Sequence, residues 1–179
     1  MRIVIIGPTK KENLWLFGRI KKNNLRKYIS NTADILNKYA DSIAIIPDNT
    51  LALEIAKEYS KGKKRVIGVI PTAKYSCKHI KKYFKFCDEF KKVDGGWSYL
   101  MTHLCLEGDA ILCCGLSPGV LVELCYTKYH NKYIKKSCPI LIDERTISKI
   151  PSEIKELNLL SFKSNRKLGE LLKWLKKKN

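Results

Sequence analysis

The sequence predicts one α/β domain over residues 1–179, a three-layer αβα sandwich whose doubly wound sheet is mostly parallel. Short apolar strands alternate with helical segments along the whole chain, which is typical of βαβ units. The clearest unit is Asp109–Tyr126, where a buried strand leads through a glycine-proline turn into a helix. A length of 179 residues suits a single domain with a substantial core.

The first half of the chain carries three predicted strands. Arg2–Ile6 is the first, and it ends at the turn Gly7-Pro8-Thr9. Ser42–Pro47 and Arg65–Ile70 are the next two, and the helix between them begins after Asp48-Asn49-Thr50. Because a helix connects these two strands, we expect them to be parallel with a right-handed crossover.

Three segments of this half are less regular. Lys10–Lys27 has apolar residues at helical spacing, but its glycine and asparagines weaken the prediction of a helix. Asn31 or Thr32 is expected to cap a helix that runs to about Tyr39. Ala73–Val93 is basic and aromatic, and it fits either a helix or a short helix followed by an edge strand.

The second half contains the central strand Ala110–Cys114, which a helix from Gly95-Gly96 to Leu106 precedes. In the turn that follows, Ser117-Pro118 supplies an N-cap and a first helical residue for the next helix. The remaining predicted elements are a strand at Ser137–Ile142, a short helix from Pro151-Ser152, a strand at Leu157–Phe162, a helix at Asn165–Trp174 and a frayed tail at Lys176–Lys178.

The turns that follow the predicted strands are candidates for a ligand site, because ligands of doubly wound sheets bind outside the carboxyl ends of the strands. The turn Gly115–Gly119 also leaves N–H groups at the positive end of a helix, where a phosphate or carboxylate would dock. An ordinary strand–helix joint fits the local pattern equally well. The candidate ligand-binding residues are Gly7, Pro8, Thr9, Asp48, Asn49, Thr50, Gly115, Leu116, Ser117, Gly119 and Val120.

The net charge of +18 predicts attraction to polyanions, so nucleic acid is a candidate partner through the lysines of Lys78–Lys92. Tyr75, His79, Tyr83 and Phe84 are interleaved with these lysines. However, the lysines are spread over nearly every helix, and no aromatic-glycine RNA-binding signature is present. A solvated surface, with the rings packed on the core, is therefore the favoured interpretation.

Seven cysteines show neither a CxxC pair nor a Cys/His ligand spacing, which indicates reduced core thiols rather than a zinc site. No metal site and no cofactor are predicted. No segment approaches the roughly 18 consecutive apolar residues of a membrane span. Since Ile3–Ile6 is also too short for a signal-peptide core, we expect a cytoplasmic protein without a membrane partner.

Two motifs resemble the LOG-like, or lysine-decarboxylase-like, proteins of the SLOG superfamily. Val66–Pro71 is similar to their V-I-G-V-x-P strand, and Asp109-Ala110, Gly119 and Glu123 fall at matching positions of D-A-x-I-x-x-P-G-G-x-G-T-x-x-E. The resemblance covers roughly residues 1–142. It implies a Rossmann-like fold and cleavage of nucleoside monophosphates into base and ribose 5-phosphate, with Glu123 as the catalytic candidate.

The chain departs from this family in the residues that would carry the chemistry. Gly115–Val120 lacks two of the glycines and the threonine, and Asp48-Asn49-Thr50 replaces a glycine-rich turn. The arginine of the family would fall near Leu100, where none is present, so the charge that holds the phosphate or sugar is lost. We therefore expect a protein that binds a nucleotide or phosphorylated ligand, with lost or altered hydrolase activity and Glu123 and Asp48 near the ribose. A solvated or capping carboxylate is the more common role for a glutamate like Glu123.

Two other functions remain open. One is an active phosphoribohydrolase or deoxyribosyltransferase-type N-glycosidase, in which Arg145, Arg65 or Arg2 replaces the missing charge. The other is a basic nucleic-acid-binding protein.

A homodimer is also plausible, because members of the resembling family commonly pair through helices beside the active site. Tyr126, Tyr129, His130 and Tyr133 lie where such a face would be, although packing inside the monomer fits them equally well. No chemistry is assigned to His79, His103 or His130.

Overall fold

A computed structural model describes residues 1–16, 18–73, 77–133, 138–154, 157 and 159–178. Its sheet is seven-stranded, with the order β4-β3-β2-β1-β5-β6-β7, and every pair of neighbours is parallel. The strands are β1 (Arg2–Ile6), β2 (Ser42–Ile45), β3 (Arg65–Pro71), β4 (Glu89–Val93), β5 (Ala110–Cys113), β6 (Ile140–Asp143) and β7 (Leu159–Phe162).

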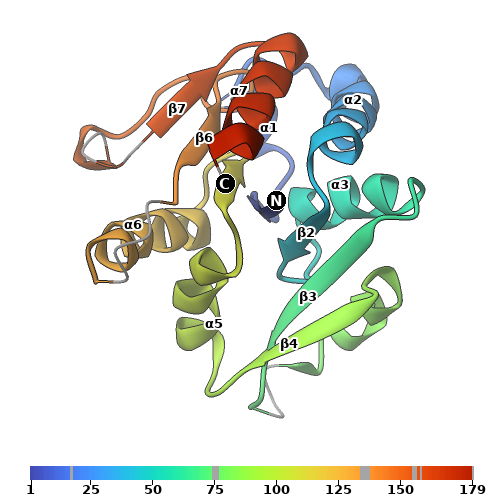
Figure 1. Cartoon of the computed structure of the whole chain (residues 1–179), viewed down its shortest axis with the longest axis vertical. Coiled ribbons are helices and arrows are strands. Elements are labelled where there is room, and N and C mark those ends of the chain that lie inside the picture. Colours follow the sequence, from blue (N-terminus) through green and yellow to red (C-terminus); the bar gives the residue numbers. More distant parts are fainter. Residues whose placement is uncertain (17, 74–76, 134–137, 155–156, 158, 179) are drawn as a thin grey trace.

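Helices cover both faces of this sheet (Figure 1). The α-helices are α1 (Asn13–Leu16), α2 (Leu25–Tyr39), α3 (Leu51–Ser60), α5 (Trp97–Leu104), α6 (Pro118–Tyr133) and α7 (Asn165–Lys178). Short 3-10 helices are η1 (Lys22–Asn24), η2 (Lys81–Phe86), η3 (Cys105–Glu107) and η4 (Ser152–Ile154). In the described part of the chain, no helix has the length and apolar character needed to cross a membrane.

The sheet is wound in two directions from its centre. The chain passes from β1 outward through β2 and β3 to β4, and then returns to the other side of β1 to form β5, β6 and β7. Val4 therefore lies opposite Ala44 on one side and Ile111 on the other. This confirms the predicted doubly wound α/β fold, and it places the switch point between β1 and β5.

Two apolar cores fix the helices on the two faces. Ile3 and Ile5 point to one face, where they pack with α2, α3 and α7. Val4 and Ile6 point to the other face, where they pack with α5 and α6. Because side chains alternate along a strand, one short apolar segment contributes to both cores.

The predicted start of α2 is wrong. The helix begins at Leu25, so Asn31 and Thr32 lie inside it rather than at its cap. Tyr28, Thr32 and Leu36 are buried at helical spacing, and the packing of this stripe outweighs the polar residues between them. In the part of the preceding segment that the structure describes, the helices are α1 and η1.

The ends of several other elements also differ from the predictions. The tail that we expected to be frayed is helical, because α7 continues to Lys178 and Lys176 Nζ lies 3.1 Å from Asp41 Oδ1. In the 73–93 segment, η2 followed by the edge strand β4 confirms the second of the two alternatives. The predicted strand start Ser137 lies outside the described residues.

Candidate functional site

A cavity of about 190 Å³ opens at the carboxyl ends of β1 and β5, where the sheet changes direction. Predicted site residues from three turns and from α6 line it: Gly7, Thr9, Asp48, Thr50, Ser117, Gly119, Val120 and Glu123. Pro8, Asn49, Gly115 and Leu116 belong to the same turns but are not among its lining residues. The structure thus brings most of the candidate ligand-binding residues to one place.

The turns after β1 and β5 meet closely at this point. Gly115 has a φ of +143°, and a Cβ on it would lie 2.8 Å from Pro8 Cδ and 2.9 Å from Leu14 Cδ2. Only glycine allows both this backbone conformation and this approach. The N–H of Cys114 also donates to Ile6 O at 2.9 Å, and Asn13 Nδ2 donates to Leu116 O at 3.3 Å.

Two helices begin beside the cavity. Ser117 Oγ accepts a hydrogen bond from the N–H of Val120 at 3.3 Å, so it caps α6 as predicted. Thr50 Oγ1 accepts one from the N–H of Leu53 at 3.3 Å and caps α3. The positive ends of two helix dipoles therefore lie at the rim of one cavity.

Glu123, on the second turn of α6, lines the cavity and is only 7 % exposed. Among the residues that the structure describes, no side chain or backbone group makes a hydrogen bond or ion pair with its carboxyl group. Burial alone raises the pKa of Glu123 to about 8. The group is therefore a neutral acid at neutral pH, and the interpretation as a solvated or capping carboxylate is wrong.

An apolar wall beside Glu123 was not predicted from the sequence. It comes from Trp97, Met101 and Leu104, all on α5. This helix connects the edge strand β4 to the central strand β5, so it must cross the sheet over the switch point. The crossover itself is the signal that predicts where such a helix lies.

The cavity contains no lysine or arginine among its described lining residues. Its other carboxyl group is that of Asp48, whose Oδ1 accepts from the N–H of Asn49 at 2.7 Å. A bound phosphate would consequently depend on backbone N–H groups and on the hydroxyls of Thr9, Thr50 and Ser117.

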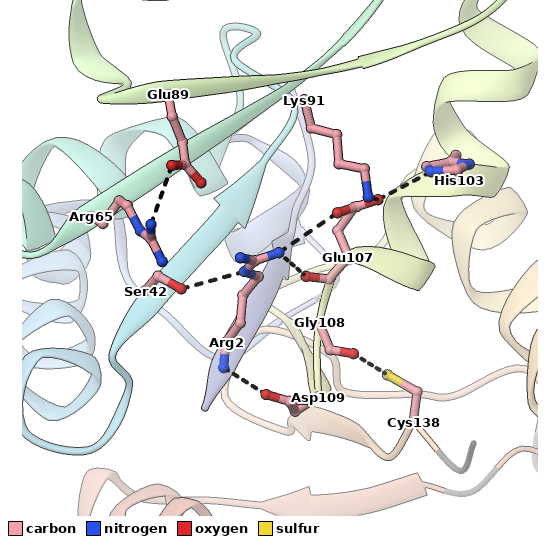
Figure 2. Close-up of polar contacts among 10 residues, drawn as sticks. All are labelled: Arg2, Ser42, Arg65, Glu89, Lys91, His103, Glu107, Gly108, Asp109 and Cys138. Atoms are coloured by element: carbon pink, nitrogen blue, oxygen red, sulfur yellow. Dashed lines mark hydrogen bonds and ion pairs between the residues drawn. The ribbon is translucent and has the colours of Figure 1, made fainter.

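None of the three arginines proposed from the sequence lines this cavity. Figure 2 shows Arg2 and Arg65 among residues at the amino ends of the strands, which is the opposite edge of the sheet. Arg145 lies near the carboxyl end of β6, but its guanidinium group is held by Asp143, with Nη2–Oδ2 and Nε–Oδ1 distances of 2.7 and 2.9 Å. The suggestion that one of them replaces the missing charge is therefore wrong for this conformation.

The amino-end edge carries an ion-pair cluster around Glu107, whose side chain is almost completely buried (Figure 2). Its Oε1 lies 2.7 Å from Lys91 Nζ and 3.1 Å from His103 Nε2, and its Oε2 lies 3.7 Å from Arg2 Nη1. The sequence gives one local signal for this cluster, the i,i+4 spacing of His103 and Glu107. The cluster joins β1, β4, α5 and η3, which indicates a structural role.

A second buried charge lies between the sheet and α2. Asp143 is fully buried and accepts a hydrogen bond from the hydroxyl of Tyr28 at 2.9 Å, besides those from Arg145. Burial, and next the electrostatic interactions with Cys114 and Asp143, raise the pKa of Tyr28. This group ties α2 to the end of β6.

The aromatic residues of the basic 73–93 segment are largely packed against the protein. Tyr83 and Phe86 contact the core, and the Phe84 ring lies 4.7 Å from that of Phe90. His79 is exposed, with its ring 5.3 Å from that of Trp97, while Tyr75 lies outside the described residues. The structure thus supports packed rings, and nucleic-acid binding through the lysines stays a prediction.

The outer face of α6 is partly aromatic. Tyr126 and Tyr129 are 42 % and 54 % exposed, and their rings are 6.3 Å apart. His130 Nε2 lies 2.7 Å from Thr102 O and so faces α5 instead. The side chain of Tyr133 lies outside the described residues, and the homodimer stays a prediction.

The seven cysteines are thiols rather than disulfides, and five of them are buried, as predicted: Cys77, Cys105, Cys113, Cys114 and Cys138. Within the described ranges, no cluster of three or more His, Cys, Asp or Glu side chains is placed to hold a metal ion.

No protein-family model and no curated protein matches the sequence. Solved structures do match the fold. The molybdenum cofactor carrier protein of Chlamydomonas reinhardtii aligns with a TM-score of 0.67 and 14 % identity, over 97 % of this chain and 96 % of that one. The fold is Rossmann-like.

Two further structures agree. The molybdenum cofactor binding protein of Rippkaea orientalis aligns with a TM-score of 0.65 and 15 % identity, over 97 % and 96 % of the two chains. DNA processing protein A of Helicobacter pylori, described by its single-stranded DNA binding, aligns with a TM-score of 0.55 and 12 % identity, over 97 % of this chain and 80 % of that one. At these identities the likeness establishes the fold and leaves the ligand open.

Proposed function

We propose that the chain binds a nucleotide or a related phosphorylated ligand in the switch-point cavity, and that its hydrolase activity is lost or altered. The observation that carries this proposal is the convergence of two helix N-termini and one buried carboxylic acid on a single cavity. The helix ends favour an anion, whereas the buried acid favours a group that forms hydrogen bonds.

The size of the cavity suits a ligand of which only one part is enclosed. At about 190 Å³ it is smaller than the roughly 300–1,000 Å³ of typical ligand pockets, so it encloses only part of a nucleotide. The flat base suits the apolar wall beside Trp97, which leaves the phosphate at the open rim near Gly119 and Thr50. The structural neighbours give general support, since two are named for a cofactor and one for single-stranded DNA.

Calorimetry with adenosine monophosphate (AMP) at pH 7 tests this proposal, and Gly119 offers a matched pair of variants. A Cβ on Gly119 meets nothing nearer than Met101 Sδ at 3.8 Å, so a side chain fits there. Gly119→Glu is expected to weaken binding by at least about fivefold, because it places a negative charge beside the phosphate, a repulsion of roughly 1–4 kcal/mol. Gly119→Gln, of the same size, is expected to weaken binding less.

Two results would contradict the proposal. Absence of binding by any nucleotide at millimolar concentration removes it altogether. An equal effect of the two Gly119 variants removes the placement of the phosphate.

The neutral state of Glu123 favours a second candidate, an N-glycosidase. A carboxyl group that is still protonated near pH 7 has the property that a general acid needs for donating a proton to a leaving base. If the chain has this activity, incubation with AMP releases free adenine, and Glu123→Gln abolishes the release. An unchanged rate in that variant would exclude Glu123 as the acid.

A further inference from the structure

We propose that Glu123 recognises the base of the bound nucleotide as a neutral carboxylic acid, with its O–H as donor and its C=O as acceptor. Its partner is a base edge that presents one acceptor beside one donor, as adenine does with a ring nitrogen and its amino group. The inference rests on the proposed function, nucleotide binding, and adds how the base is selected.

The first observation behind this inference is the position of Glu123. Its side chain is more than nine-tenths buried, yet it lines the cavity. The hydrogen bonds of this residue to the described protein involve its backbone, where Cys105 Sγ and Thr127 Oγ1 each donate to Glu123 O at 3.0 Å. The carboxyl group thus lies at the cavity without a described hydrogen-bond partner. Buried polar groups normally have such a partner. A ligand that supplies both bonds would satisfy it.

The surroundings keep the acid neutral. Cys105 on η3 and Cys113 on β5 are titratable groups close to Glu123, and burial raises the pKa of each thiol to about 12, so neither is charged. Asp48, from the turn after β2, is the other carboxyl group of the cavity, and no described lining residue carries a positive charge that would favour ionisation of Glu123. The described lining residues of β1 and α5 carry no ionisable side chain.

A base suits this acid better than the other parts of a nucleotide. A phosphate offers only acceptors, and a neutral acid has a single donor for it. A ribose diol presents two donors, which suits an ionised carboxylate. Glu123 also lies four residues beyond Gly119, roughly 6 Å farther along the helix than the end where the phosphate docks. Trp97 lines the same cavity and provides a flat apolar surface for stacking.

Calorimetric titration of AMP and of ribose 5-phosphate between pH 7 and 9.5 tests the inference. The second phosphate pKa is about 6, so the phosphate stays fully charged over this range. With the native protein, the Kd for AMP is expected to rise about tenfold per pH unit above 8, as one proton is required. Ribose 5-phosphate, which has no base, is expected to bind more weakly and without this dependence.

Variants of Glu123 test whether ionisation of this carboxyl group causes the pH dependence of the Kd. Glu123→Gln keeps one acceptor and adds a donor that never ionises, so its Kd for AMP is expected to stay constant across the range. Glu123→Ala is expected to bind AMP at least about tenfold more weakly at pH 7. Glu170→Gln, on the exposed surface of α7, serves as a control and is expected to match the native protein.

The outcomes separate the inference from the proposed function. If the Kd of the native protein for AMP does not change with pH, the inference is overturned and nucleotide binding is left intact. The same pH dependence with ribose 5-phosphate overturns the assignment to the base. Absence of binding by every nucleotide removes the proposed function itself.

Discussion

Replacing Glu123 by glutamine is expected to raise the free energy of unfolding of the ligand-free protein by about 3 kcal/mol at pH 7. The pKa of Glu123 is about 8 in the folded state and near its ordinary value of 4.5 in the unfolded chain. Between these values the unfolded chain binds fewer protons than the folded one, so the stability of the native protein falls as the pH rises. Glutamine stays neutral and avoids this loss.

The measurement is a series of urea or thermal unfolding curves from pH 4.5 to 8.5. The stability difference between the variant and the native protein is expected to be small at pH 4.5, to grow by about 1.4 kcal/mol per pH unit, and to level off above 8. At pH 7 it corresponds to a rise in Tm of roughly 6–12 °C. Glu170→Gln controls for the loss of a surface carboxylate. A difference that does not grow between pH 5 and 8 would show that the acid is not buried as described.

The second large effect is expected at Asp143. Asp143→Ala should lower the free energy of unfolding by about 3–5 kcal/mol, because it leaves a partly buried guanidinium group without its partner. Arg145 donates to this carboxylate through Nη2, Nε and its backbone N–H, at 2.7, 2.9 and 3.0 Å. Tyr28 loses its acceptor in the same variant. Equilibrium unfolding in urea measures the change.

A double-mutant cycle with Tyr28→Phe provides the control. Tyr28→Phe alone removes one hydroxyl and is expected to be destabilising by about 1 kcal/mol. In the Asp143→Ala background, Tyr28→Phe should lower the free energy of unfolding by less, because the hydrogen bond of the tyrosine is already lost. If Tyr28→Phe lowers the free energy of unfolding equally in both backgrounds, the tyrosine and the aspartate do not act together. A loss of free energy of unfolding below about 1 kcal/mol for Asp143→Ala would rule out a structural role for the buried charge.

The fold and the placement of the site follow closely from the sequence. Parallel strands bring their carboxyl ends to one edge, so the turns at Gly7–Thr9 and Gly115–Gly119 meet once β1 and β5 pair. The caps at Thr50 and Ser117 were also predictable, since capping depends on residues within one turn of chain.

The missed features depend on residues that are far apart in the sequence. The state of Glu123 is set by burial against α5, which a solitary glutamate on a helix does not reveal. Glu107 gathers Arg2 and Lys91 from different strands, and only the spacing to His103 is local. The start of α2 was missed because polar residues at its surface concealed the buried stripe.

The close approach of Pro8 and Gly115 gives the region around the cavity parts with different freedom to vary. It brings together the turns after β1 and β5, where the two halves of the sheet meet, and any side chain at Gly115 would force these turns apart. The apolar wall of the cavity consists of side chains on α5, such as Trp97 and Met101. Substitutions on α5 can therefore change the shape of the cavity while the neighbouring turns keep theirs. A lineage with this fold can alter the cavity one wall residue at a time, without rebuilding the turns beside it.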